Sequence, residues 1–88
     1  MEITEVRLHI INKDSLKAFA SITFDGLFCV TGITIREGRH GLFVSMPQRK
    51  VQDGTYKDIV FPLTRELREQ ITEAVLHEYG AEVSDLPF

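Results

Sequence analysis

Five basic side chains in the second half of the chain are candidates for binding an anionic ligand: Arg49, Lys50, Lys57, Arg65 and Arg68. Lysine and arginine neutralise phosphate groups and release counterions, which gives affinity for nucleic acid whatever its sequence. Arg49 and Lys50 follow an apolar stretch that stops at Pro47, so we expect them in a loop. Gly54 permits a tight turn before Lys57 brings the chain back. This loop is therefore a candidate phosphate-binding element.

Arg65 and Arg68 lie in the first turns of the one segment with convincing helical periodicity. Exposed N–H groups and the helix dipole favour a phosphate at a helix N-terminus. Residues three apart also share a helix face. We therefore expect the basic loop and the helix start to form two halves of one binding surface. Arginine is the commonest donor to guanine and would supply any base-specific contact.

Each of these residues also has a purely structural interpretation. The basic loop could be a solvated segment that keeps a small sheet protein in solution. Arg65 and Arg68 could pair with glutamates of their own helix, which contributes a few tenths of a kcal/mol per pair. Arg36 and Arg39 flank an expected hairpin turn and could serve only to protect a strand edge.

The residue types that most often catalyse reactions or bind metals are sparse: His9, His40, His77 and Cys29. No two of them have the spacing of a metal-ligand pair, and no glycine-rich loop leads from a strand into a helix. Cys29 lies in an apolar run, which is typical of an inert core thiol. We expect no enzymatic activity, no metal or other cofactor and no small-molecule substrate.

Length and composition indicate one small globular domain of 88 residues, with 43% apolar and 26% charged residues. No apolar run approaches the roughly 18 residues of a membrane helix. The N-terminus lacks the pattern of a secretory signal, and the single cysteine has no intrachain partner. We expect a cytoplasmic protein that does not associate with membranes.

Charge is unevenly distributed along the chain, although the net charge is only −3. Residues 36–68 contain seven basic and four acidic side chains, a local charge of +3. Residues 69–88 contain five acidic side chains and no lysine or arginine, a local charge of −5. The basic charge is therefore concentrated in residues 36–68, and the net charge of the whole chain does not reveal it.

Four segments have the patterns of β-strands joined by short turns: 3–11, 16–24, 27–37 and 42–46. In the first two segments apolar residues alternate with polar or small ones, as in half-buried strands. Asp25-Gly26 is a strong hairpin signal. Gly32 within the third strand indicates a bulge or bend, and Pro47 ends the fourth strand. The segments predict an antiparallel meander.

The rest of the chain predicts a short edge segment over 58–63 and one amphipathic helix over 64–80. Thr64 is expected to be the N-cap, and Gly80 the left-handed residue that follows the helix. We expect residues 1–80 to form a single domain and residues 81–88 a C-terminal tail. The predicted fold class is α+β, an antiparallel four- to five-stranded β-meander with one C-terminal helix.

One helix can cover only one face of such a sheet. Alternation places Phe19, Ile11, Phe43 and, by the same pattern, Cys29 on the other face, which would be too apolar to face water. A second copy of the chain would bury it, so we expect a homodimer. The alternative is that these apolar residues are scattered singly, which monomers tolerate.

Four stretches of this sequence resemble the SpoVG family of septation and stage V sporulation proteins: "ASITFDGLFCV", "GLFVSMPQRK", "DGTYKDIVFP" and "AVLHEY". The resemblance covers residues 2–79. Its most specific part is the strand that ends at Pro47 and is followed by the basic pair. The resemblance implies a small bacterial dimer that binds DNA, and in some members RNA, to regulate gene expression, with effects on sporulation and asymmetric septation.

Together these observations predict a non-catalytic regulator that binds nucleic acid through five basic residues: Arg49, Lys50, Lys57, Arg65 and Arg68. The alternative is a protein-interaction module that acts in septation without nucleic acid, for example by strand addition. Salt dependence separates the two classes, because phosphate binding weakens steeply as salt rises and an apolar contact does not.

Overall fold

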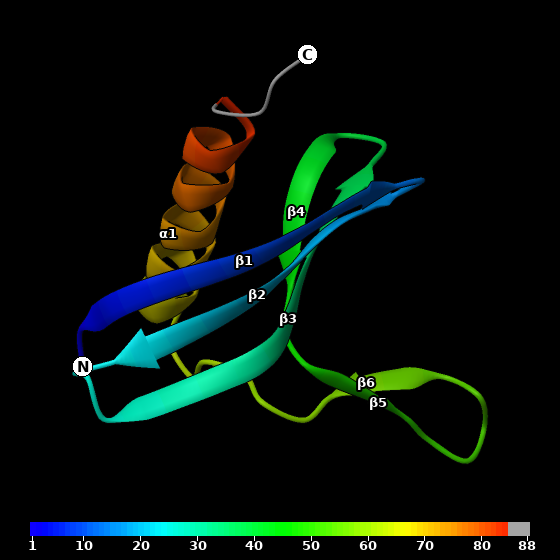
Figure 1. Ribbon diagram of the computed structural model, residues 1–88. Helices are drawn as coiled ribbons and strands as arrows, with labels where there is room; N and C mark the ends of the chain where they lie inside the picture. The colour runs from blue at the N-terminus through cyan, green and yellow to red at the C-terminus, as the bar shows by residue number, and fades with distance from the viewer. Residues whose placement is uncertain (85–88) are drawn as a thin grey trace.

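The computed structural model describes residues 1–84, which form one four-stranded sheet, one two-stranded sheet and one helix (Figure 1). The strands of the larger sheet are β1 (Ile3–Lys13), β2 (Leu16–Phe24), β3 (Phe28–Gly38) and β4 (Gly41–Ser45). The smaller sheet consists of β5 (Gln48–Lys50) and β6 (Tyr56–Asp58). The helix α1 spans Arg65–Ser84. The predicted α+β fold is confirmed.

The larger sheet is an antiparallel meander in the order β1-β2-β3-β4, as predicted. Asp25 and Gly26 form the turn between β2 and β3, and their φ angles are +53° and +64°. The Leu27 N–H donates to the Phe24 carbonyl at 2.9 Å across this turn. Two positive φ angles define a type I′ turn, whose twist matches that of the strands it joins.

Gly32 lies at an irregularity in β3, where the pairing with β2 shifts between Ala20 and Ile22. Its φ is +85°, a conformation that side chains other than glycine rarely adopt. The predicted bulge is therefore confirmed. Pro47 lies against Gly32 and follows the end of β4, which confirms the predicted stop.

The hydrophobic core lies between the larger sheet and α1, which covers one face of that sheet (Figure 1). β2 contributes the centre of the core through alternate side chains that are at most 5% exposed: Ala18, Ala20, Ile22 and Phe24. Ile33 and Ile35 of β3, Met46 directly after β4, and Ile71 and Val75 of α1 complete it. Alternate residues of β2 and residues on one face of α1 thus pack against each other in a single core.

The start of α1 is as predicted, but its end is not. The Thr64 Oγ1 accepts a hydrogen bond from the Leu67 N–H at 3.1 Å, which confirms Thr64 as the N-cap. The prediction that Gly80 follows the helix is wrong, because Gly80 is helical and α1 continues to Ser84. Tyr79 holds this region against the sheet, since its hydroxyl donates to Asn12 Oδ1 at 2.9 Å. The first four residues of the expected tail belong to α1, and 85–88 lie outside the described residues.

Two further expectations differ from the structure. Segment 48–58 is a short hairpin and not an irregular loop, whereas the predicted edge segment over 58–63 is irregular beyond Asp58. Cys29 is exposed, so the prediction of a core thiol is wrong. The physical reason is register: Cys29 lies opposite Thr23, and both alternate with core residues such as Ile22.

Candidate nucleic-acid interface

The β5–β6 hairpin brings three of the five candidate residues together. Arg49 lies directly opposite Lys57 in the antiparallel register, and Lys50 lies opposite Tyr56. Directly opposed residues share a face of the hairpin, and their Cβ atoms are about 5 Å apart. Arg49 and Lys57 therefore present two positive charges on one face, while Lys50 and Tyr56 share the other. All four side chains are exposed.

The turn of the hairpin is held by a dense set of hydrogen bonds. The Val51 N–H donates to the Thr55 carbonyl at 2.8 Å, and the Gly54 N–H donates to the Val51 carbonyl at 3.0 Å. Asp53 Oδ1 accepts from the Thr55 hydroxyl at 2.7 Å and from the Thr55 N–H at 2.9 Å. These two bonds, the hydroxyl first, lower the pKa of Asp53. The turn fixes the geometry of the basic strands on either side.

No acidic side chain within residues 1–84 forms an ion pair with Arg49, Lys50 or Lys57. Asp58, the one acidic residue in β5 and β6, instead accepts a hydrogen bond from Gln48 Nε2 at 2.9 Å. Like charges placed directly opposite each other across two strands destabilise the pairing. An anion between Arg49 and Lys57 would remove that repulsion.

The two candidate residues of the helix start lie on a separate element and differ from each other. The Arg65 Nε donates to Glu69 Oε1 at 3.0 Å, the i,i+4 pair that the structural interpretation anticipated. Arg68 is exposed and forms no ion pair within the part of the chain that the structure describes. Arg68 is thus the freer cation of the two.

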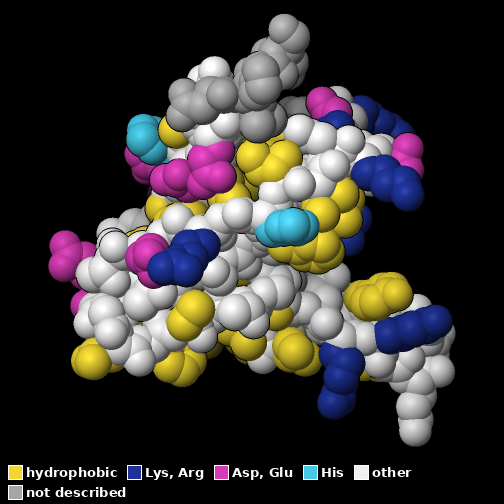
Figure 2. Space-filling model, in the orientation of Figure 1, with side chains coloured by type: hydrophobic (Ala, Val, Ile, Leu, Met, Phe, Trp, Pro, Cys, Tyr) yellow, Lys and Arg dark blue, Asp and Glu magenta, His cyan; other side chains and the backbone are white. Residues whose placement is uncertain are grey.

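The hairpin projects from the body of the molecule, away from α1 (Figure 1). Figure 2 shows basic side chains on this projection and acidic side chains over the region of α1 and the start of β1, while both kinds occur at the far end of the sheet, near the β1–β2 and β3–β4 turns. The hairpin is therefore one of two places where basic side chains gather on this face of the molecule. A projecting, positively charged hairpin has access to the groove of a duplex or to a single strand.

Sequence reasoning missed two features beside the basic residues. Tyr56 is 64% exposed and shares a hairpin face with Lys50, which is a suitable arrangement for stacking on an unpaired base. The segment from Ile59 to Leu63 leaves four large apolar side chains exposed: Ile59, Val60, Phe61 and Leu63. The signal for the second was an apolar run interrupted by a proline, which we interpreted as a strand.

A metal site would need several histidine, cysteine or acidic side chains close together, and the sequence predicts none. Within residues 1–84 no three of these side chains are grouped so that they could hold a metal ion. In the same part of the chain, α1 is not apolar enough to cross a membrane.

Comparison with known proteins identifies the family. The SpoVG family profile matches residues 1–81. A protein of Caldicellulosiruptor saccharolyticus, provisionally named septation protein SpoVG, is 44% identical over 85 residues, which cover 96% of this chain and 97% of the relative. A protein of the same name from Treponema denticola is 48% identical over 80 residues, which cover 90% of this chain and 86% of the relative. The chain belongs to the SpoVG family.

Proposed function

We propose that this chain is a non-catalytic regulator that binds nucleic acid, DNA and also RNA, through its β5–β6 hairpin. Its relatives are named for septation, and we propose a role in that process through the control of gene expression. The observation that carries the proposal is the pair Arg49 and Lys57, two exposed cations in direct opposition without an acidic partner in residues 1–84. A phosphate group is the ligand that such a pair favours.

Lys50, on the other face of the hairpin, and Arg68, on α1, supply further cations that form no ion pair within residues 1–84. Arg65 contributes less, because a phosphate must compete with Glu69 for its guanidinium. Tyr56 adds a stacking platform, and stacking requires an exposed base. The hairpin is therefore suited to both a duplex backbone and a single strand, with Tyr56 acting only on the second.

The test is a fluorescence-anisotropy titration of labelled duplex DNA and single-stranded RNA at 50 and 200 mM salt. If three cations of one hairpin neutralise phosphates, duplex affinity falls roughly fortyfold between these salt concentrations. The Arg49→Ala/Lys50→Ala variant should bind more weakly, and its slope of log affinity against log salt should become shallower by about 2. Tyr56→Ala should weaken binding of the RNA and leave duplex binding unchanged.

The matched control is Arg7→Ala/Lys13→Ala, which removes two cations of β1 and leaves the hairpin intact. This variant should bind like the wild type. Equal losses in both double variants would mean diffuse attraction and would remove the hairpin as the site. Failure of the wild type to bind either nucleic acid would refute the proposal and favour the alternative, a septation role exerted through protein contacts.

We further propose that the chain acts as a homodimer. Register places Phe19 opposite Thr34 and Thr34 opposite Ser45, so Phe19 and Phe43 lie on the sheet face that α1 does not cover. These two phenylalanines are 44% and 45% exposed, and Cys29 is exposed on the same face. A second copy would remove this apolar surface from water and present two hairpins to one nucleic acid.

Sedimentation equilibrium tests the dimer. The wild type should sediment as a dimer, and Phe19→Ser/Phe43→Ser should shift it towards monomer. Leu27→Ser, at a turn residue that is 90% exposed, is the control and should have no effect. A wild type that stays monomeric at high micromolar concentration would exclude the dimer.

A further inference from the structure

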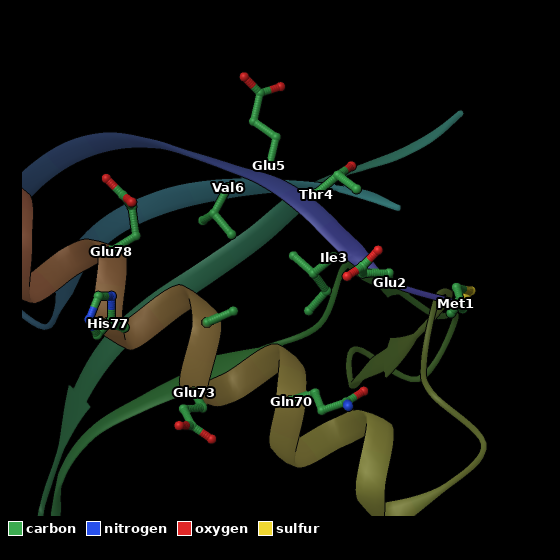
Figure 3. A pocket seen from close by; sticks show the side chains of 11 residues that line it. Met1, Glu2, Ile3, Thr4, Glu5, Val6, Gln70, Glu73, His77 and Glu78 are labelled. Atoms are coloured by element: carbon green, nitrogen blue, oxygen red, sulfur yellow. The ribbon is translucent and has the colours of Figure 1, made fainter. Parts of the chain in front are cut away.

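A groove of about 650 Å³ separates the start of β1 from one face of α1. One wall is the run of consecutive residues from Met1 to Val6. The other wall comprises residues of α1 that share one helix face by their spacing: Gln70, Glu73, Ala74, His77 and Glu78. Figure 3 shows Ile3 and Val6 pointing from the strand towards the helix. Both side chains are half-buried, so the floor of the groove is apolar.

The strand wall of this groove is an unpaired edge. β1 is the outermost strand of its sheet and is hydrogen-bonded only to β2. The backbone N–H and C=O groups on its outer side therefore have no strand partner within residues 1–84. An edge of this kind can accept an additional extended segment, which gains affinity from main-chain hydrogen bonds.

The groove is strongly acidic. Four glutamates line it, two from each wall: Glu2, Glu5, Glu73 and Glu78. Glu5 is partly neutralised by Arg7 at 3.0 Å, and the α-amino group of Met1 lies at one end. Glu73 and Glu78 form no ion pair within residues 1–84. Figure 3 shows the Glu5 side chain projecting from β1 away from α1, so the acidic side chains nearest the helix wall are those of α1 itself.

We propose that this groove binds a basic extended segment of a partner protein by strand addition to β1. The backbone of the partner would pair with the first half of β1. Its alternate side chains would point towards α1, where lysine or arginine meets Glu73 and Glu78. The charge of the groove selects a basic segment and repels nucleic acid. This site therefore operates independently of the basic hairpin, on the opposite side of the molecule.

Charged side chains also guard strand edges against unwanted pairing, and the bulge between Ile3 and Glu5 is a device of the same kind. The two explanations differ in one measurable way. A guarded edge does not bind an added strand. A docking groove binds one, and it binds a peptide with free backbone N–H groups more tightly than a peptide whose N–H groups are blocked.

The probe is a fluorescein-labelled seven-residue peptide of alternating lysine and valine, titrated into the full chain by anisotropy. A second peptide has the same sequence with backbone N-methyl groups at alternate residues, which keeps its charge and prevents pairing along one edge. The expected result is saturable binding of the first peptide and binding at least tenfold weaker for the second. The variant Glu73→Lys/Glu78→Lys should weaken binding of the first peptide about tenfold.

The control variant Glu37→Lys/Glu66→Lys makes the same change in net charge outside the groove and should bind the peptide like the wild type. Circular dichroism verifies that both variants fold, and hairpin-dependent nucleic-acid binding should persist in both. Equal affinity for the two peptides, equal losses in the two variants, or no binding at all would each overturn the proposal. So would sedimentation data in which the peptide displaces a second copy of this chain, because the groove would then belong to self-assembly.

Discussion

The four-stranded sheet and the β5–β6 hairpin use the same antiparallel pairing but are stabilised by different forces. In the sheet, alternate residues of β2 are buried against α1, and Ile22 has no exposed surface. In the hairpin, all six strand residues are exposed, and two cations face each other across the strands. Burial therefore explains the residues on the sheet face that α1 covers, and it explains none of those in the hairpin. Substitutions of buried sheet residues should therefore lower stability, whereas substitutions in the hairpin should lower affinity for nucleic acid.

The largest expected effect on stability comes from shortening one buried side chain of the sheet. Ile22→Ala removes a side chain from the centre of the core and should lower the free energy of unfolding by about 3 kcal/mol, because the neighbours cannot fill the cavity. Tyr56→Ala removes a larger side chain from the hairpin and should change it by less than about 0.5 kcal/mol. Urea denaturation followed by circular dichroism measures both values. Similar losses of stability in the two variants would mean that the hairpin is part of the cooperative core.

Smaller changes in stability, of opposite sign, are expected from replacing Gly80 and Gly26 with alanine. Gly80 lies in a helix with open space around its missing Cβ, so Gly80→Ala should stabilise the protein by about 0.5–1 kcal/mol. Gly26 also has open space, but its φ is +64°, so Gly26→Ala should destabilise it by about 1 kcal/mol. Thermal unfolding measures both shifts. A loss in Gly80→Ala would mean that α1 ends at this residue, as its sequence alone suggested.

Most strands were predictable because alternation, Asp25-Gly26 and Pro47 are local signals that agree with the packing around them. The β5–β6 pairing was not predictable, because strands of three exposed residues have no apolar alternation. Gly80 is a strong stop signal, yet the contacts of Tyr79 with the sheet continue the helix past it. Local propensity fails where tertiary packing opposes it.

The candidate residues could be chosen from the sequence, but which of them lie close together in space could not be predicted from it. The opposition of Arg49 and Lys57 depends on the register of the hairpin, which a turn of unknown type leaves open. The acidic groove depends on α1 lying beside β1, two elements at opposite ends of the chain. Charge counting along the sequence detected the acidic segment but not the strand edge that faces it.

A still smaller effect should appear when the charge opposition in the hairpin is removed. Lys57→Thr keeps a residue that favours strands and should raise stability by a few tenths of a kcal/mol, because Arg49 loses a like-charged neighbour. The same variant should bind duplex DNA more weakly, with a salt slope shallower by about 1. The control is Lys17→Thr in β2, which removes a cation paired with Glu37 at 3.5 Å. This control should lose stability and keep its affinity. A hairpin variant that loses stability would show that Lys57 serves the fold.

The smallest expected effect concerns the acidic end of α1. The pKa of Glu82 is raised, first because its protonated side chain hydrogen-bonds to Glu78, and then by desolvation and by the charge of Glu78. A carboxyl group whose pKa is raised on folding contributes stability at pH values below its ordinary pKa of 4.5, and this contribution is lost as the pH rises through the raised pKa. Glu82→Gln should therefore stabilise the protein at pH 7 by about 0.3 kcal/mol, the size of a like-charge pair at i,i+4.

The thermal midpoint of Glu82→Gln relative to the wild type should fall as the pH is lowered from 7 to 4, because protonated Glu82 then provides a hydrogen bond of its own. Glu66→Gln is the contrasting control, since an acid in the first turn of a helix is favoured by the dipole and its loss should destabilise the protein at pH 7. A constant difference between Glu82→Gln and the wild type across this range would mean that Glu82 does not interact with Glu78. Because Glu78 also lines the acidic groove, that outcome would leave its carboxylate fully available to a basic partner.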